Sequence, residues 1–276
     1  MNLIEIAILG LVQGLTEFLP ISSSGHLVLF PKLFGWADPG LVVDAFLHLG
    51  TLAAVLIYFR KDLWELCDGL HLSLWAKLKN PRSLIPKIHR KMIAIIVATI
   101  PVVIVGFTFK PFFESSLVRS IPSIAFTLSF GAILLWFSER YGKQKKDFYD
   151  LSLLQIFLIG TAQILALFPG FSRSGATIIA GLFAGLKRDE AAKFSFLVGV
   201  PAVGGAGLLS VKDLYDHYSV NFTPEAYGEI GILLLGLVVS FVSGLFAIDF
   251  LIKFLRNNPT HAFVIYRIIL AAVILF

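Results

Sequence analysis

Two stretches of this sequence decide its fold: Gly10-Leu-Val-Gln-Gly-Leu-Thr-Glu-Phe-Leu-Pro-Ile-Ser-Ser-Ser-Gly25 and, 150 residues later, Gly160-Thr-Ala-Gln-Ile-Leu-Ala-Leu-Phe-Pro-Gly-Phe-Ser-Arg-Ser-Gly175. Seven of the sixteen positions are identical: Gly10/Gly160, Gln13/Gln163, Leu15/Leu165, Phe18/Phe168, Ser22/Ser172, Ser24/Ser174 and Gly25/Gly175. Shared hydrophobicity explains the leucine and phenylalanine matches, but not a glutamine, two serines and a glycine in register. The sequence therefore indicates an internal duplication in which each half carries one copy of the motif.

The composition is typical of a membrane protein. Of the 276 residues, 57% are hydrophobic and only 15% are charged, which is too little charge for the surface of a water-soluble domain. The net charge of +5 then reports orientation in the membrane, and no nucleic-acid partner is expected. The single cysteine, Cys67, excludes an internal disulfide and a cysteine-based metal cluster. Apolar runs predict six transmembrane helices, at 41–59, 92–109, 121–138, 192–210, 229–252 and 261–276.

The lysines and arginines are unevenly spread between these runs. Most of them lie in four groups, within 60–91, 139–150, 187–193 and 253–256. The remaining connections contain only Lys32, Lys110, Arg119 and Lys212. By the positive-inside rule the four groups are cytoplasmic, and the alternation of spans then predicts that both termini are exterior.

Two further segments fit neither a simple span nor a plain loop. A proline, three serines and a glycine make 20–36 a poor exterior loop, and 151–186 begins and ends beside cytoplasmic basic groups. We therefore predict that 2–36 and 151–186 are re-entrant hairpins. The expected fold is an all-α polytopic membrane protein with two inverted-topology repeats, 1–150 and 151–276, each a re-entrant helical hairpin plus three transmembrane helices. Inverted repeats with broken helices place their site near the membrane midplane.

Each hairpin tip contains a Pro/Gly break and then a Ser-x-Ser-Gly sequence that opens a second helix. Backbone N–H groups at a helix start, together with serine hydroxyls, form a binding site for an anion such as phosphate. The alternative interpretation is that the serines only cap the helix. Two such tips, one with an arginine, favour a phosphate site that uses Ser22, Ser24, Gly25, Ser172, Ser174 and Gly175.

The charged residues of the tips predict chemistry. Arg173 is costly at membrane depth unless it meets an anion, and its fork suits bidentate phosphate binding; the alternative is a salt bridge with Glu17. Gln13 and Glu17 lie one helical turn apart and face the same side. They are candidates to hold a divalent cation, Mg²⁺ or Ca²⁺, with Glu17 as the metal ligand. Glu17 is also a candidate general base.

His26 follows the first tip, whereas the second copy has Ala176 at that position. His26 and Glu17 occur only in the first copy and Arg173 only in the second, as expected of a site shared between the halves. His26 is a candidate nucleophile or proton donor; the alternative is a satisfied core histidine. Two other predictions are structural pairs: Asp44 with His48, and Arg267 with Asp249.

With these residues identified, the whole chain resembles the undecaprenyl-pyrophosphate phosphatase family, also called the bacitracin-resistance family. The resemblance rests on Gln13-Gly-Leu-Thr-Glu17, on Phe18-Leu-Pro-Ile-Ser-Ser-Ser-Gly-His26 and on Pro169-Gly-Phe-Ser-Arg-Ser-Gly-Ala-Thr177. It implies a multi-pass enzyme of the bacterial plasma (inner) membrane that removes the terminal phosphate of a C55 isoprenyl pyrophosphate. This activity recycles the lipid carrier of peptidoglycan and cell-wall synthesis, which links the family to cell shape and bacitracin resistance.

The resemblance also assigns roles to residues. Matching motifs place the catalytic residues at Glu17, Ser23, His26 and Arg173, and the substrate-binding residues at Gln13, Ser22, Ser24, Gly25, Ser172, Ser174, Gly175 and Thr177. The family often has glutamate where this chain has Gln13, so a divalent cation would need further ligands from substrate phosphates or water. The expected partners are a polyprenyl pyrophosphate and bilayer lipids; a homodimer is left open. The rival interpretation is a transporter, such as a polyprenyl-phosphate flippase, because inverted repeats with broken helices also build transporters.

Overall fold

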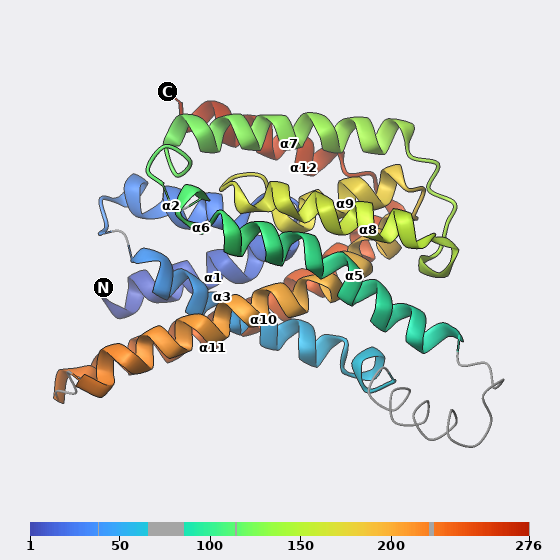
Figure 1. Ribbon diagram of the computed structural model, residues 1–276. Coiled ribbons are helices and arrows are strands. Elements are labelled where there is room, and N and C mark those ends of the chain that lie inside the picture. The colour runs from blue at the N-terminus through green and yellow to red at the C-terminus, as the bar shows by residue number, and fades with distance from the viewer. Residues whose placement is uncertain (38, 66–85, 114, 221–223, 276) are drawn as a thin grey trace, which may run out of the picture.

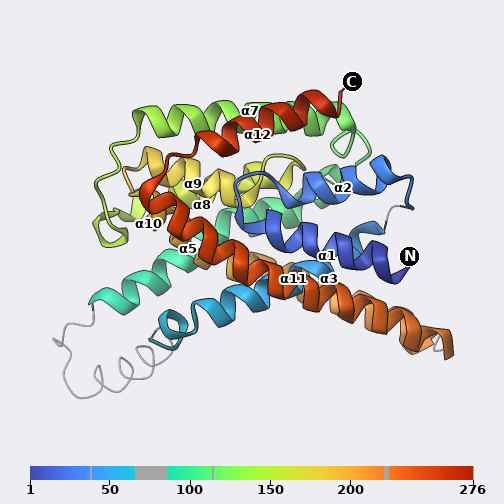
Figure 2. The same cartoon turned by 180° about the vertical axis from the view of Figure 1, so that it is seen from behind.

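The computed structural model describes the chain except for residues 38, 66–85, 114, 221–223 and 276, so Cys67 lies outside the described residues. Within that part, all regular elements are helices, as predicted (Figures 1 and 2). They are α1 Leu3–Phe18, α2 Ser23–Phe34, α3 Gly40–Tyr58, α5 Pro86–Thr108, α6 Lys110–Phe113, α7 Ile121–Tyr141, α8 Leu153–Ala162, α9 Arg173–Phe183, α10 Arg188–Val220, α11 Pro224–Asn257 and α12 His261–Val273, with 3₁₀ turns η1 Phe148–Asp150 and η2 Gln163–Leu167.

Helices α1 and α2 form the first hairpin. Asn2 caps α1 by accepting hydrogen bonds from the N–H groups of Ile4 and Glu5. The Glu5 side chain in turn accepts a hydrogen bond from the N–H of Asn2, which completes a capping box. Helix α1 ends at Phe18, just before Pro20, a residue that disfavours helical geometry in its predecessor. Ser22 then caps α2, which ends where Gly35 adopts the left-handed conformation.

Helices α8 and α9 form the second hairpin, joined by the 3₁₀ turn η2. The first arm is less regular than α1, because its last residues before Pro169 tighten from α-helix to 3₁₀ geometry. Ser172 caps α9 as Ser22 caps α2. In Figure 1 the two hairpins point into the molecule from opposite ends, and their tips meet in its interior. A hydrogen bond of 3.1 Å from the Gly170 N–H to the Ser22 hydroxyl joins the tips.

Four helical segments are long and apolar enough to cross a membrane by length and composition: Arg90–Thr108, Ile121–Tyr141, Arg188–Leu209 and Gly228–Asn257. They correspond to four of the six predicted spans. The other two predicted spans, 41–59 and 261–276, contain the shorter apolar segments Phe46–Tyr58 and His261–Val273. Thirteen helical residues extend about 20 Å, which is shorter than a hydrocarbon core of about 30 Å.

The outside of the helix bundle is apolar, as expected of a surface that faces lipid. Large hydrophobic side chains are strongly exposed, among them Phe107 at 83%, Leu117 at 75% and Leu208 at 72%. The same surface in water would be an unusually large apolar patch. The chain is therefore a multi-pass helical membrane protein.

Close helix approaches bring the hairpins against the long helices. Gly10 of α1 lies against the backbone of Gly236 in α11, and Gly160 of α8 lies against the backbone of Ala98 in α5. A side chain at either glycine would collide with backbone, so small residues are required at both contacts. The matched glycines of the sequence duplication thus make the same kind of contact.

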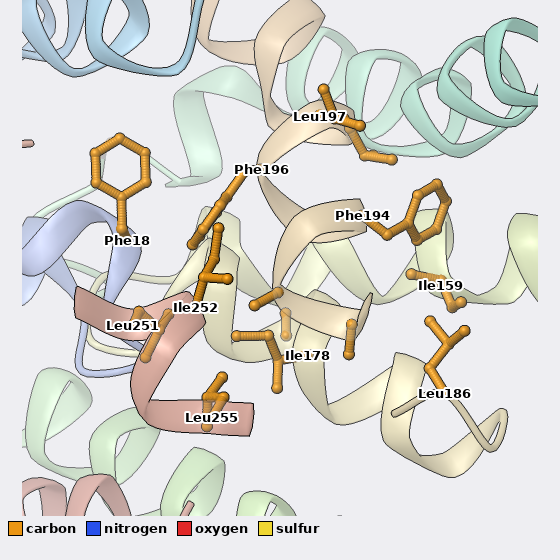
Figure 3. Packing of buried hydrophobic residues seen from close by; sticks show 14 of the residues in the cluster. Phe18, Ile159, Ile178, Leu186, Phe194, Phe196, Leu197, Leu251, Ile252 and Leu255 are labelled. Atoms are coloured by element: carbon orange, nitrogen blue, oxygen red, sulfur yellow. The ribbon is translucent and has the colours of Figure 1, made fainter. Parts of the chain in front are cut away.

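The largest apolar cluster surrounds the meeting point of the tips (Figure 3). Phe18, the residue after Glu17, packs edge-on against Phe196 of α10 with ring centroids 5.2 Å apart. Leu251, Ile252 and Leu255 of α11 belong to the same cluster. Because Phe18 is held in this cluster, the end of α1 and the neighbouring Glu17 are fixed relative to α10.

Candidate functional site

The two tips have nearly the same local geometry. Ser22 and Ser172 have φ angles of +75° and +77°, a left-handed region that non-glycine residues rarely adopt. Each hydroxyl accepts a hydrogen bond from the N–H three residues later, Gly25 at 3.2 Å and Gly175 at 3.0 Å. Both serines therefore cap the helices that follow them. Each hydroxyl also contacts the serine two positions on, Ser24 at 3.3 Å and Ser174 at 3.1 Å.

Glu17 is the centre of the polar cluster at the tips. Its carboxylate is 5% exposed and accepts a hydrogen bond of 2.6 Å from the Ser23 hydroxyl and one of 3.2 Å from the Gln13 amide. Its other oxygen lies 2.9 Å from Nη2 of Arg173. The Glu17–Arg173 salt bridge, the alternative to phosphate binding by Arg173, is thus present, and it joins the first hairpin to the second.

The guanidinium of Arg173 has one N–H donor that is not used in the described structure. Its Nη1 donates to the carbonyl oxygen of Ser195 at 3.0 Å, while its Nε–H is buried and has no hydrogen-bond partner among the residues that the structure describes. Gly199 of α10 leaves the space that the guanidinium occupies, since a side chain there would collide with it. An unpaired buried N–H is costly, and an anion is the partner that a guanidinium prefers.

Other predicted binding residues hold the second tip in place. The Ser174 hydroxyl donates to the carbonyl oxygen of Leu19 at 3.0 Å, which is a second link between the tips. Thr177 contacts the hydroxyl of Ser195 at 2.6 Å and donates to the carbonyl oxygen of Arg173 at 2.9 Å. These residues position Arg173 and its neighbours from the interior of the fold.

His26 makes a different set of contacts. Its Nδ1 lies 2.6 Å from the carbonyl oxygen of Ser22, and its Nε2 lies 2.6 Å from the hydroxyl of Tyr266, whose ring stacks on the imidazole. Among the described residues, no hydrogen bond or ion pair joins His26 to Glu17 or Arg173. The structure therefore brings Glu17, Ser23, Gln13 and Arg173 together, whereas His26 contacts Ser22 and Tyr266.

Sequence reasoning missed the part that His48 plays. Its Nε2 lies 3.4 Å from the Glu17 carboxylate, and its Nδ1 lies 2.6 Å from the backbone carbonyl of Asp44. The expected side-chain pair of Asp44 and His48 is thus a side chain-to-backbone contact. One signal in the sequence could have identified His48. It is an ionisable residue within a predicted span, and such a residue is a functional candidate by default.

The predicted pair of Arg267 with Asp249 is wrong. Arg267 is fully buried and donates to backbone carbonyls at the two tips, Pro20 and Gly170, and to two in α7, Thr127 and Leu128. Asp249 instead pairs with Lys253 at 2.7 Å and accepts from Tyr58. Carbonyls freed by the two helix breaks supply the acceptors that a carboxylate would otherwise provide.

The space beside Glu17 is small in this state. Its volume is ≈ 10 Å³, room for about one water molecule. It is lined by Glu17, Phe18, Thr51, Leu52, Val55, Arg173, Phe196, Gly199, Val200 and Val203. A phosphate group needs more room, so binding one requires α3 and α10 to separate or the Glu17–Arg173 pair to open.

A divalent cation fits part of this cluster. Within the described residues no group of three or more histidine, cysteine, aspartate or glutamate side chains gathers at one point. However, the side-chain oxygen of Gln13 is buried without a hydrogen-bond partner, one helical turn from Glu17. Two oxygen ligands of this kind suit a hard cation whose remaining positions are filled by phosphate oxygens or water.

Taken together, the fold and the site define a class: a multi-pass helical membrane protein with a buried polar cluster, which includes Glu17 and Arg173, where two hairpin tips meet. Comparison with known sequences gives the family. The family described as Bacitracin resistance protein BacA matches residues 6–273, and the chain belongs to that family.

Curated relatives are similar over almost their whole length. The chain is 46% identical to "Undecaprenyl-diphosphatase 2" of Stutzerimonas stutzeri (strain A1501), with 100% of this chain and 98% of the relative covered. It is 43% identical to "Undecaprenyl-diphosphatase" of Synechococcus sp. (strain RCC307), covering 97% and 91%. It is 41% identical to the protein of that name from Alcanivorax borkumensis, covering 100% and 99%.

Proposed function

We propose that this protein is an undecaprenyl-diphosphatase, an integral membrane enzyme that hydrolyses undecaprenyl diphosphate to undecaprenyl phosphate and inorganic phosphate. The observation that carries the proposal is the cross-tip cluster, in which Arg173 of one hairpin meets Glu17 and Ser23 of the other. The names of the relatives supply the substrate. An apolar outer surface suits the polyprenyl tail, and the buried cluster suits the diphosphate head.

The hydrogen bond between Ser23 and Glu17 favours Ser23 as the nucleophile. A serine hydroxyl that donates at 2.6 Å to a carboxylate has its general base in place. Its oxygen would form a bond to the terminal phosphorus as its proton passes to Glu17. The bond from that phosphorus to the bridging oxygen would break, and undecaprenyl phosphate would leave with that oxygen. Water would then hydrolyse the phosphoserine, which releases phosphate and restores the hydroxyl.

Arg173 would stabilise the charge that develops on the transferred phosphoryl group. Opening of the Glu17–Arg173 pair frees the guanidinium fork, and the unpartnered Nε–H adds a further donor. Helices α2 and α9 begin after Ser22 and Ser172, and the positive ends of their helix dipoles would add to the attraction for the phosphates. His26, held between Ser22 and Tyr266, stays a predicted proton donor to the leaving group.

Gln13 and Glu17 would hold a divalent cation. Bound there, the cation would neutralise phosphate charge and orient the diphosphate between the tips. The unpartnered Gln13 oxygen supports this assignment. We expect the cation to be required for phosphate release.

The two halves, 1–150 and 151–276, would be inverted repeats in the plasma membrane of a bacterium, with hairpins 2–36 and 151–186 re-entrant and both termini exterior. Three observations support this arrangement: hairpins that point inward from opposite ends, matched N-caps at Ser22 and Ser172, and matched glycine contacts. In the cell the enzyme would regenerate the lipid carrier of peptidoglycan synthesis and so contribute to bacitracin resistance. A homodimer is compatible with this role.

The experiment that tests the function is phosphate release from undecaprenyl diphosphate by the purified protein, with and without a chelator. The proposal predicts release of one phosphate per lipid and its suppression by the chelator. Movement of undecaprenyl phosphate across a vesicle membrane, without phosphate release, would instead identify a flippase. Full activity after removal of metals would exclude the divalent cation from the mechanism.

A further inference from the structure

One buried arginine binds both hairpin tips and belongs to neither hairpin. Arg267 lies in α12, and its Nη1 donates to the carbonyl oxygen of Pro20 at 3.1 Å. Its Nη2 donates to the carbonyl oxygen of Gly170 at 3.2 Å. Pro20 and Gly170 are 150 residues apart, so they occupy the same position in the two copies of the duplicated motif. The guanidinium therefore bridges equivalent carbonyls of the first and the second tip.

Helix α7 fixes the guanidinium from a third direction. The Nε of Arg267 donates to the carbonyl oxygen of Leu128 at 3.1 Å, and Nη2 also donates to that of Thr127 at 3.2 Å. Gly131 of the same helix leaves the space for the guanidinium, since a side chain there would collide with it. Four carbonyls are thus bound by one rigid plane of donors. A lysine has only three donors on a single nitrogen and cannot bind all four.

The reaction proposed above leaves this link between the tips undisturbed. The Glu17–Arg173 pair also joins the tips, but it has to open when Arg173 turns to the phosphates. Arg267 bonds to backbone carbonyls, and within the described residues no hydrogen bond or ion pair joins it to Glu17, Ser23 or Arg173. It can therefore hold the tips in place at the moment when their salt bridge is broken.

We infer that Arg267 is a positioning residue for this reaction: by holding the carbonyls of Pro20 and Gly170 it sets the spacing of the two tips. That spacing places Arg173 of one tip against Ser23 and Glu17 of the other. The inference rests on the proposed function. A misplacement of about 1 Å at a reacting centre can lower the rate by about 10²-fold. The polyprenyl tail needs no such alignment, so the effect belongs in kcat and not in KM.

The test compares Arg267→Lys with the wild-type protein, both as the full chain, purified in detergent and monodisperse. The kcat for phosphate release from undecaprenyl diphosphate should fall by about 10²-fold, with KM close to its wild-type value. Without substrate, hydrogen–deuterium exchange of the peptides that contain the two tips should become faster, because the tips open locally more often. Arg188→Lys is the matched control. Arg188 joins α10 to Glu139 of α7, away from the tips, so this variant should keep wild-type kcat and wild-type exchange at the tips.

Three results would overturn the inference: tip peptides of Arg267→Lys that exchange at the wild-type rate, faster exchange with a wild-type kcat, or a raised KM with kcat unchanged. Faster exchange with a wild-type kcat would leave Arg267 a structural role only. Should Arg267→Lys not fold, Gly131→Ala keeps the arginine but displaces its guanidinium, and it should give the same lowered kcat and faster exchange.

The wild-type protein separates this inference from the proposed function. Phosphate release by the wild type with an unimpaired Arg267→Lys variant defeats only the positioning role. No phosphate release by the wild type defeats the function, and hydrogen exchange then still decides whether Arg267 holds the two tips together.

Discussion

Arg173 reaches from the second hairpin to the first, and its guanidinium makes two contacts and leaves one donor unpaired among the described residues. Nη2 pairs with Glu17, Nη1 holds the carbonyl of Ser195, and Nε points to no partner. A lysine in this place would keep the charge but has a single nitrogen on a flexible stem. Bidentate contact with a phosphoryl group depends on the planar fork.

Arg173→Lys should therefore lower kcat by about 10²-fold or more, the usual cost of losing one donor to the transition state. Phosphate release by detergent-purified, monodisperse variants measures the effect. Turnover at the wild-type rate would show that charge alone suffices and that the fork has no role.

Ser23→Ala tests the assignment of the nucleophile. The substitution removes the hydroxyl that donates to Glu17 and should reduce turnover by several orders of magnitude, because no covalent intermediate can form. Ser138→Ala is the matched control. Ser138 is equally buried but donates to Leu135 in its own helix, so this variant should retain activity. Near-normal turnover of Ser23→Ala would point to direct attack by water.

Some site residues could be predicted from the sequence and others could not, for a physical reason. Glu17 and Arg173 stand out because an ionisable side chain at membrane depth must meet a partner, and the duplication placed the two in matching tips. Arg267 was given the wrong partner, because it bonds to backbone carbonyls at the two tips; His48 does contact Asp44, but its contact with Glu17 of another helix was not predicted. The free carbonyls of a broken helix are not visible in a sequence, so a carboxylate seemed the more natural partner.

At the scale of elements, the helix breaks were predictable and the helix lengths were less so. Pro20 and the Pro169–Gly170 pair end the first arm of each hairpin close to the expected positions. The 3₁₀ turn η2, however, was not predicted from its apolar sequence. Likewise 261–276 is apolar apart from His261 and Arg267 but contains only the short helix α12, which buries Arg267 between α7 and the tips.

Helix α10 offers a prediction about the space around Arg173. Gly199→Ala should displace the guanidinium and lower kcat by about 10²-fold, since small misplacements at a reacting centre are that costly. Gly205→Ala, on the same helix, is the control because a methyl group there meets nothing within 4 Å. This control should keep full activity. Equal activity of both variants would mean that the position of Arg173 is not critical.

For the whole molecule, the orientation in the membrane follows from the basic residues and can be measured at the single cysteine. Cys67 lies in the segment 60–91, which we predict to be cytoplasmic. A membrane-impermeant thiol reagent should fail to label it in intact cells and should label it after permeabilisation. Strong labelling of intact cells would invert the predicted orientation and remove the case for re-entrant hairpins.

The central claim is that one active site is shared by the two halves of the chain, through Glu17 and Arg173. The most direct measurement is kcat/KM for Glu17→Ala, Arg173→Ala and the double variant, all folded and purified. Residues that act as one unit are strongly non-additive. The shared site predicts that each single variant loses activity by about 10²-fold or more, and that the double variant is little worse than either. A double variant whose loss equals the product of the two single losses would contradict it.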